Sequence, residues 1–137
     1  MNAGLLAALL AAGAPMVVVP GGEARFVPID PSRPDGAAIA VLRGDPATGP
    51  SDMLIRMGCG EGRLHVHSAD YRLVVISGTM RHRAAGETGE VMDLGAGSYW
   101  FQPGGAVHAD SCLSEECVMF ISWTGPRDAR LPDGESR

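Results

Sequence analysis

The chain has 137 residues, and its 16 acidic and 11 basic residues give a formal net charge of −5 with no basic block. A chain of this length forms about one domain, and without a basic patch it has nothing to neutralise a phosphate backbone, which argues against a nucleic-acid partner. Every basic residue is arginine, so Schiff-base chemistry by lysine is excluded as well.

The chain begins with an apolar run, MNAGLLAALLAAGA, whose length and small-residue end are typical of a secretory signal. No basic residue precedes the run, and Pro15 follows the expected cleavage point, which argues against efficient processing. We treat residues 1–15 as a candidate export signal, with a structural helix or a misplaced start codon as alternatives. The expected location is therefore periplasmic or secreted, and otherwise cytoplasmic. The run is too short to span a bilayer.

Short runs rich in valine, isoleucine and aromatic residues follow, separated by glycine and proline turns. They are VVV, RFVPI and AAIAVL before residue 50, then MLIRM, RLHVH, YRLVVIS, TMRHR, VMDL, SYWFQ, AVHADSC and CVMFISW. Eight or more short strands at this spacing predict an all-β fold over residues 16–124, as a closed barrel or jelly roll. Residues 125–137 are polar, and we expect a frayed tail there.

The first chemical signal is a pair of histidines, His65 and His67, two residues apart on a predicted strand. Their side chains point to the same face, with Cα atoms roughly 6.5–7 Å apart. Two imidazoles at this separation can converge on one metal ion at about 2.0–2.1 Å each. The pair alone is weak evidence, because surface histidines produce the same pattern by chance.

The second signal is GSYWFQPGGAVH, which spans residues 97–108. A strand ends at Pro103, because proline cannot continue a hydrogen-bonded ladder, and Gly104 and Gly105 allow a tight reversal. The reversal returns the chain beside the first strand and brings His108 toward the histidine pair.

Together, residues 58–78 and 97–112 resemble the paired signature of the cupin superfamily. The signature has a glycine, His-x-His and a later glycine, then a glycine, five residues, Pro-x-Gly, two residues and a histidine. The runs HSADYRLVVISGTM and GSYWFQPGGAVHADSC are most similar to small single-domain members, often exported and without an assigned reaction. The resemblance implies a jelly-roll barrel that holds one divalent metal through His65, His67 and His108, and a homodimer formed through an edge strand. It implies no particular reaction, because this fold hosts enzymes, binding modules and sensors.

The sequence departs from the family at one ligand position. Many cupins place a glutamate ligand seven residues before the glycine that closes the first motif, and Tyr71 stands there relative to Gly78. We predict a centre of three neutral histidines, with the Tyr71 hydroxyl as a catalytic donor near the open position. Without an anionic ligand the ion keeps most of its charge, which favours anionic substrates. The alternatives are that Tyr71 only lines the wall, or that a shifted register brings in Asp70.

Further candidates for the site lie near the histidines. His82, between two arginines, is a second catalytic candidate, either as a ligand or as an acid/base. Arg63 shares the phase of the histidine pair and could bind a substrate carboxylate, and Asp110 could contact substrate or orient a ligand histidine. Trp100 and Gln102 are candidates for the substrate-contacting wall. The alternative for His82, Arg63 and Asp110 is a surface position.

The three cysteines divide into a pair and a single residue. Cys112 and Cys117 flank Leu-Ser-Glu-Glu, a predicted hairpin loop, which would make them cross-strand partners with Cβ atoms roughly 4.5–5.5 Å apart. We expect a disulfide if the protein is exported and two free thiols if it is cytoplasmic. Cys59 is left over, and we expect it to be buried.

Three imidazole ligands favour Fe or Zn, with Ni, Mn or Cu as further choices, over Ca or Mg. Such a centre supports a metal-dependent enzyme of dioxygenase or isomerase-like type that acts on a small oxygen-bearing or anionic molecule. The alternative is a non-catalytic domain that binds or senses a small molecule with the help of the metal.

Overall fold

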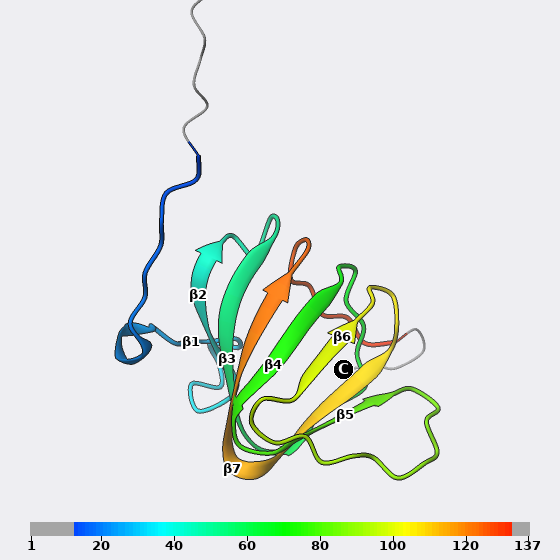
Figure 1. Cartoon of the computed structure of the whole chain (residues 1–137). Coiled ribbons are helices and arrows are strands. Elements are labelled where there is room, and N and C mark those ends of the chain that lie inside the picture. The colour runs from blue at the N-terminus through cyan, green and yellow to red at the C-terminus, as the bar shows by residue number, and fades with distance from the viewer. Residues whose placement is uncertain (1–12, 133–137) are drawn as a thin grey trace, which may run out of the picture.

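In the computed structural model, which describes residues 13–132, the chain folds into antiparallel strands (Figure 1). In chain order the elements are η1 (Gly21–Glu23), β1 (Val27–Pro28), β2 (Ala38–Gly44), β3 (Ser51–Glu61), β4 (Tyr71–Ser77), β5 (Met80–Ala84), β6 (Tyr99–Gln102) and β7 (His108–Trp123). The all-β prediction is confirmed. Within residues 13–132 no helix has the length and apolar character needed to cross a membrane. Most of the candidate export signal (1–12) and the end of the predicted tail (133–137) lie outside the described residues.

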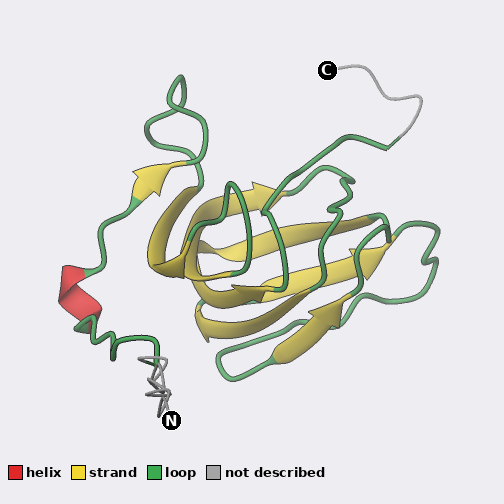
Figure 2. Ribbon diagram, turned by 90° about the horizontal axis from the view of Figure 1, so that it is seen from above, coloured by secondary structure: helices red, strands yellow, loops and turns green. Residues whose placement is uncertain are grey.

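The longest strand, β7, connects the two parts of the sheet, whose order is β1-β2-β3-β7-β4-β6 with β5 paired to β7. Its second half pairs with β3 on one side and β4 on the other, so that Met119 lies opposite both Ile55 and Val75. Its first half pairs with β5, from Ala84 opposite His108 onward. Figure 1 shows β7 changing from yellow to orange as it curves, and Figure 2 shows the sheet curling around an interior.

The interior is filled by alternate residues of the central strands, because successive side chains of a strand point to opposite faces. On β4, for example, Tyr71, Leu73 and Val75 are buried while Arg72 is exposed. Fully burying an apolar side chain of this size contributes about 1.5–3 kcal/mol relative to leaving it exposed. The core cluster consists of Met53, Tyr71, Leu73, Val75, Met80, Trp100, Cys112, Cys117, Met119, Ile121 and Trp123.

The predicted hairpin between Cys112 and Cys117 is wrong, because both cysteines lie on β7, which keeps its direction. In the ladder with β3, Gly58 pairs with Glu116 and Gly60 with Cys112, so β7 uses four residue steps where β3 uses two. The surplus loops out as a bulge. The cysteine Cα atoms are 5.9 Å apart, whereas five extended residues would span about 17 Å. The disulfide is nevertheless present and closes the base of the bulge.

Some predicted strands are shorter in the structure. RLHVH and VMDL form only isolated bridges, which join His65 to His108, Val66 to Arg130 and Leu94 to Met80. The run VVV at 17–19 is exposed and forms no strand. Cys59, which we expected to be buried, is exposed, because it lies where the β3 ladder shifts register.

The end of the chain differs most from expectation. Residues 125–132, which we call the C-terminal strap, pack against the barrel instead of fraying. Val66 and Arg130 exchange two backbone hydrogen bonds of 2.9 and 3.0 Å, and the Arg127 amide donates to the Pro46 carbonyl at 2.7 Å. The Asp128 carboxylate accepts a bond of 2.8 Å from the Ser68 amide. The strap therefore lies beside the predicted histidine pair.

Candidate metal centre

His65, His67 and His108 come together from segments about 40 residues apart in the chain, as predicted. The backbone causes this approach, because the amide of His65 donates to the His108 carbonyl at 2.9 Å and the reverse bond is 3.0 Å. The Gly105 amide, in the turn before His108, donates to the His67 carbonyl at 2.8 Å. One possible ligand atom from each histidine lies within 4.8 Å of the other two.

Each of the three imidazoles has its Nδ1 atom against a backbone carbonyl oxygen. The acceptors are the carbonyls of Arg63 for His65 (2.9 Å), Asp128 for His67 and Ala106 for His108 (3.0 Å). A carbonyl oxygen only accepts, so every Nδ1 carries the proton and every Nε2 keeps a free lone pair. The three rings are thus fixed in the tautomer that binds a metal through Nε2.

Burial in the protein interior keeps two of these rings, those of His67 and His108, in the neutral form. Burial lowers the pKa of His67 to about 4, and burial lowers the pKa of His108 as well. Both imidazoles are therefore unprotonated at Nε2 near pH 7. Metal ions require histidine in this neutral form.

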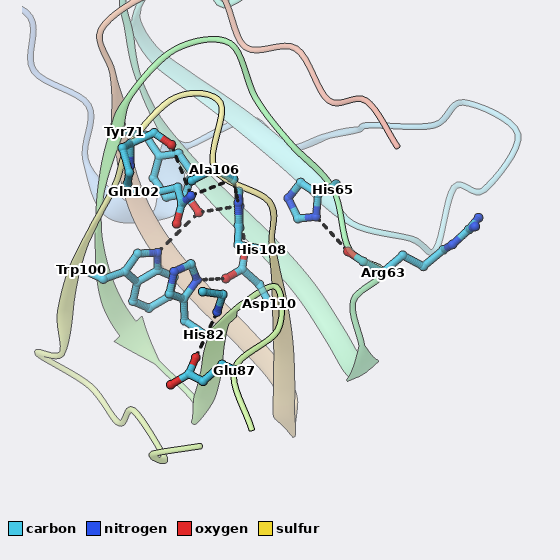
Figure 3. A network of polar contacts seen from close by, with 12 residues as sticks. Arg63, His65, Tyr71, His82, Glu87, Trp100, Gln102, Ala106, His108 and Asp110 are labelled. Carbon is cyan, nitrogen blue, oxygen red and sulfur yellow. Dashed lines mark hydrogen bonds and ion pairs between the residues drawn. The ribbon is translucent and has the colours of Figure 1, made fainter. Parts of the chain in front are cut away.

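Tyr71, which stands at the position where the sequence resemblance led us to look for a glutamate, points into this cluster (Figure 3). Its hydroxyl lies 3.1 Å from Nε2 of His108 and accepts the indole N–H of Trp100 at 3.4 Å. Because Nδ1 of His108 carries the proton, the tyrosine hydroxyl is the donor to Nε2. Burial raises the pKa of Tyr71, so the hydroxyl keeps its proton.

Asp110, which we predicted to contact substrate or to orient a ligand histidine, also reaches the cluster. One oxygen of Asp110 lies 2.6 Å from Nδ1 of His82, and the other lies 3.9 Å from Nε2 of His108. Asp110 does not hydrogen-bond to Nδ1 of His108, because that nitrogen lies against the Ala106 carbonyl. Asp110 therefore adds negative charge on the side where the metal-binding nitrogens converge.

Comparison with known proteins identifies the family. A family model described as "Domain of unknown function (DUF4437)" matches residues 17–128. The chain belongs to the DUF4437 family. A search of the curated proteins found no match.

Solved structures give the fold of this DUF4437 protein. An RmlC-like cupin from Shewanella frigidimarina NCIMB 400 has a TM-score of 0.63 and 19% identity, over 80% of this chain and 91% of that one. KdgF from Halomonas sp. has a TM-score of 0.62 and 17% identity, over 84% and 96%. DMSP lyase DddQ from Ruegeria pomeroyi DSS-3 has 0.64 and 18%, over 90% and 75%. These likenesses show the cupin fold, which the sequence resemblance implied.

Trp100 and Gln102, which we predicted to line the wall of the substrate pocket, instead contact other residues of the site and its turn. Trp100 donates to Tyr71 and stacks on His82, with ring centroids 4.9 Å apart and an interplanar angle of 19°. The buried Gln102 amide donates to the carbonyls of Pro103 (3.3 Å) and Ala106 (3.0 Å), which fixes the turn before His108. Neither Trp100 nor Gln102 lines the cavity beside the histidines.

That cavity has a volume of about 600 Å³. Its polar and charged lining consists of His65, His67, Tyr71, Asp30, Asp110, Arg33, Arg63 and Arg127. Arg63 is on its rim, but its side chain extends away from the three histidines (Figure 3). Sequence reasoning missed Arg127, which lines the cavity from the C-terminal strap. The Gly-Pro pair at 125–126, a turn signal directly after the last strand, is the sequence clue that the chain reverses there.

Proposed function

We propose that this DUF4437 protein is a metal-dependent cupin enzyme, of dioxygenase or isomerase-like type, that acts on a small anionic or oxygen-bearing molecule. The observation that carries the proposal is the fixed tautomer of His65, His67 and His108, whose Nε2 lone pairs are directed to one place by backbone carbonyls. Three imidazoles suit Fe or Zn, and also Ni, Mn or Cu.

The donor set fits such an ion, because it offers three imidazole nitrogens, and a cavity lies beside His65 and His67. A bound divalent metal would polarise a substrate oxygen as a Lewis acid or, as iron, activate dioxygen. Tyr71 would then no longer share Nε2 of His108, and its hydroxyl would donate to an oxygen of the substrate. Burial, which raises the pKa of Tyr71, keeps that donor protonated.

We assign different roles to the two members of the His82–Asp110 pair. Asp110 lines the cavity and is the group that can accept a proton from a bound molecule. His82 holds one oxygen of that carboxylate at 2.6 Å and is itself fixed by stacking on Trp100. His82 is therefore a positioning residue, and Asp110 is the catalytic candidate.

Structures of similar fold include proteins described as DMSP lyases, so this fold is compatible with an enzyme. The deciding experiment is elemental analysis of protein purified without a chelating tag, followed by oxygen-uptake measurements after Fe(II) loading. We expect about one metal ion per chain in the wild type and almost none in His67→Ala. Tightly bound zinc without oxygen uptake, and without turnover of any small acid tested, would instead favour the binding or sensor function.

We also propose that the protein is exported and forms a homodimer. The Cys112–Cys117 disulfide supports export, because such bonds persist in oxidising compartments. The free edge of the sheet at β6 supports the dimer, since Tyr99 and Phe101 are both about half exposed there. One titratable thiol, Cys59, in protein recovered from the periplasm would agree with export, and three would contradict it. Light scattering tests the dimer directly.

A further inference from the structure

The C-terminal strap contributes a positively charged side chain to the cavity beside the histidines. Arg127 lines the cavity together with His65 and His67. Its backbone is anchored by the 2.7 Å bond to the Pro46 carbonyl, so the residue has a fixed place.

In the described part of the chain, Arg127 has no carboxylate partner of the kind that a partly buried arginine usually has. Among residues 13–132, no carboxylate lies within ion-pair distance of its guanidinium group. The adjacent carboxylate, Asp128, is turned to the Ser68 amide instead. Arg127 is half-buried, so its charge is partly removed from water, and this burial lowers the pKa of its guanidinium group. A desolvated charge without a partner is costly, so an anion that entered the cavity would be stabilised there.

The other arginines on this cavity are placed differently. Arg33 is exposed and lies close enough to Asp30 to help lower the pKa of that carboxyl, after the hydrogen bonds from Ser32. Arg63 is exposed and its side chain extends away from the histidines (Figure 3). Arg127 is therefore the arginine best placed to meet an anion beside the histidine cluster.

The rest of the cavity wall restricts the kind of anion. Behind the polar groups the lining is apolar and comes from the barrel interior, with Ile55, Met57, Leu73, Met80, Met119 and Ile121. Such a surface favours hydrocarbon over a highly charged or heavily hydroxylated body. A guanidinium group binds a carboxylate through two parallel hydrogen bonds.

We propose that Arg127 binds the carboxylate of the substrate, and that this substrate is a small carboxylic acid with an apolar body. This proposal rests on the proposed function, because that function places the reacting atoms of the substrate at the three histidines. The contact between Arg127 and the carboxylate does not require the metal, so the two ideas can fail separately.

The test measures binding of hexanoate, with hexanamide as its uncharged counterpart. Trp123 lines the cavity, so tryptophan fluorescence reports occupancy. We expect Arg127→Gln to weaken hexanoate binding about 10- to 100-fold, the loss of one charge-assisted contact. Arg127→Lys should lose less hexanoate affinity than Arg127→Gln. Hexanamide should bind weakly, and with equal affinity to the wild type and to Arg127→Gln. The matched control is Arg130→Gln, which removes an exposed arginine from the same strap and should behave as wild type.

Metal content and melting temperature are measured on every variant, and the titrations are repeated after removal of metal with a chelator. Unchanged hexanoate affinity in Arg127→Gln would overturn the proposal, as would an equal loss in Arg130→Gln. Inorganic phosphate that competes as strongly as hexanoate would show that the apolar carboxylate is the wrong ligand class. A protein that binds no metal but shows the Arg127 effect would contradict the proposed enzyme and leave the carboxylate site standing.

Discussion

The three histidines differ in how the protein holds them. His65 is held by a carbonyl two residues away, His67 by the strap, and His108 by its own turn and by Tyr71. His108 is 1% exposed, so it is part of the core as well as of the centre. A ligand that is also a core residue has two effects when removed, and the three positions should therefore not respond alike.

We predict that His65→Ala, His67→Ala and His108→Ala each lose the metal and keep the β-sheet circular dichroism signal, because strand register is set by the core. His108→Ala should also be less stable by about 1–3 kcal/mol, since the buried Tyr71 hydroxyl loses its acceptor. Metal analysis and urea unfolding check both statements. Full metal retention in any one variant would remove that histidine from the centre.

Tyr71 offers a second test at single-residue level. Tyr71→Phe should retain the metal but weaken ligand binding or turnover, because only the hydroxyl donor is removed. Tyr71→Glu should bind the metal more tightly, since it supplies a carboxylate ligand that the three-histidine centre lacks. Competition with a coloured chelator measures both affinities. Metal loss in Asp70→Ala together with no change in Tyr71→Glu would show that the three-histidine assignment is wrong.

At the level of elements, the turn between β6 and β7 is where sequence and structure agree best. A Cβ atom on Gly104 would lie 2.3 Å from the Ser68 carbonyl oxygen, so the position requires glycine. We predict that Gly104→Ala destabilises the fold by about 1–3 kcal/mol. It should also lower metal affinity, because the added methyl group displaces Ser68, which is the neighbour of His67 in the chain. Gly95→Ala, with nothing within 4 Å of its added Cβ, is the control. Equal stability and affinity in the two variants would contradict the argument.

The parts that sequence could predict depend on local chemistry. Pro103, Gly104 and the histidine spacing act within a few residues, so the motif predicted both the turn and the cluster. The contact between His67 and the Asp128 carbonyl spans 61 residues and has no side-chain signature at either end. The course of β7 past Cys112 was missed for a different reason: a bulge within a strand and a hairpin loop have similar compositions.

On the scale of the whole molecule, the centre depends on two long-range connections that close the barrel around it. β7 brings His108 and Asp110 to the cluster while its other half forms the middle of the sheet. The C-terminal strap supplies the carbonyl that fixes His67 and the arginine that we propose for substrate. The strap is polar, yet its Asp128 carbonyl holds the ring of His67. We therefore expect metal affinity to depend on the strap being folded against the barrel.

Protonation gives the clearest whole-molecule test of this coupling. In metal-free protein, burial lowers the pKa of His67 from its ordinary 6.5 to about 4, and burial lowers the pKa of His108 in the same direction. Between these values the unfolded chain binds more protons than the folded chain, so stability is present above pH 6.5 and is lost as the pH falls toward 4. A shift of this size corresponds to at most about 3 kcal/mol for His67.

We therefore predict that the free energy of unfolding of metal-free protein, measured with urea and a chelator present, falls steadily from pH 7 to pH 5. His67→Gln should flatten this dependence, because glutamine fills much of the same space and cannot titrate. The carboxyls with lowered pKa values, such as Asp128, lose their contribution only near and below their ordinary value of 3.8, so the window above pH 5 reports mainly the histidines. A stability that stays level or rises between pH 7 and pH 5, or an unaltered slope in His67→Gln, would mean that His67 is not held neutral by burial.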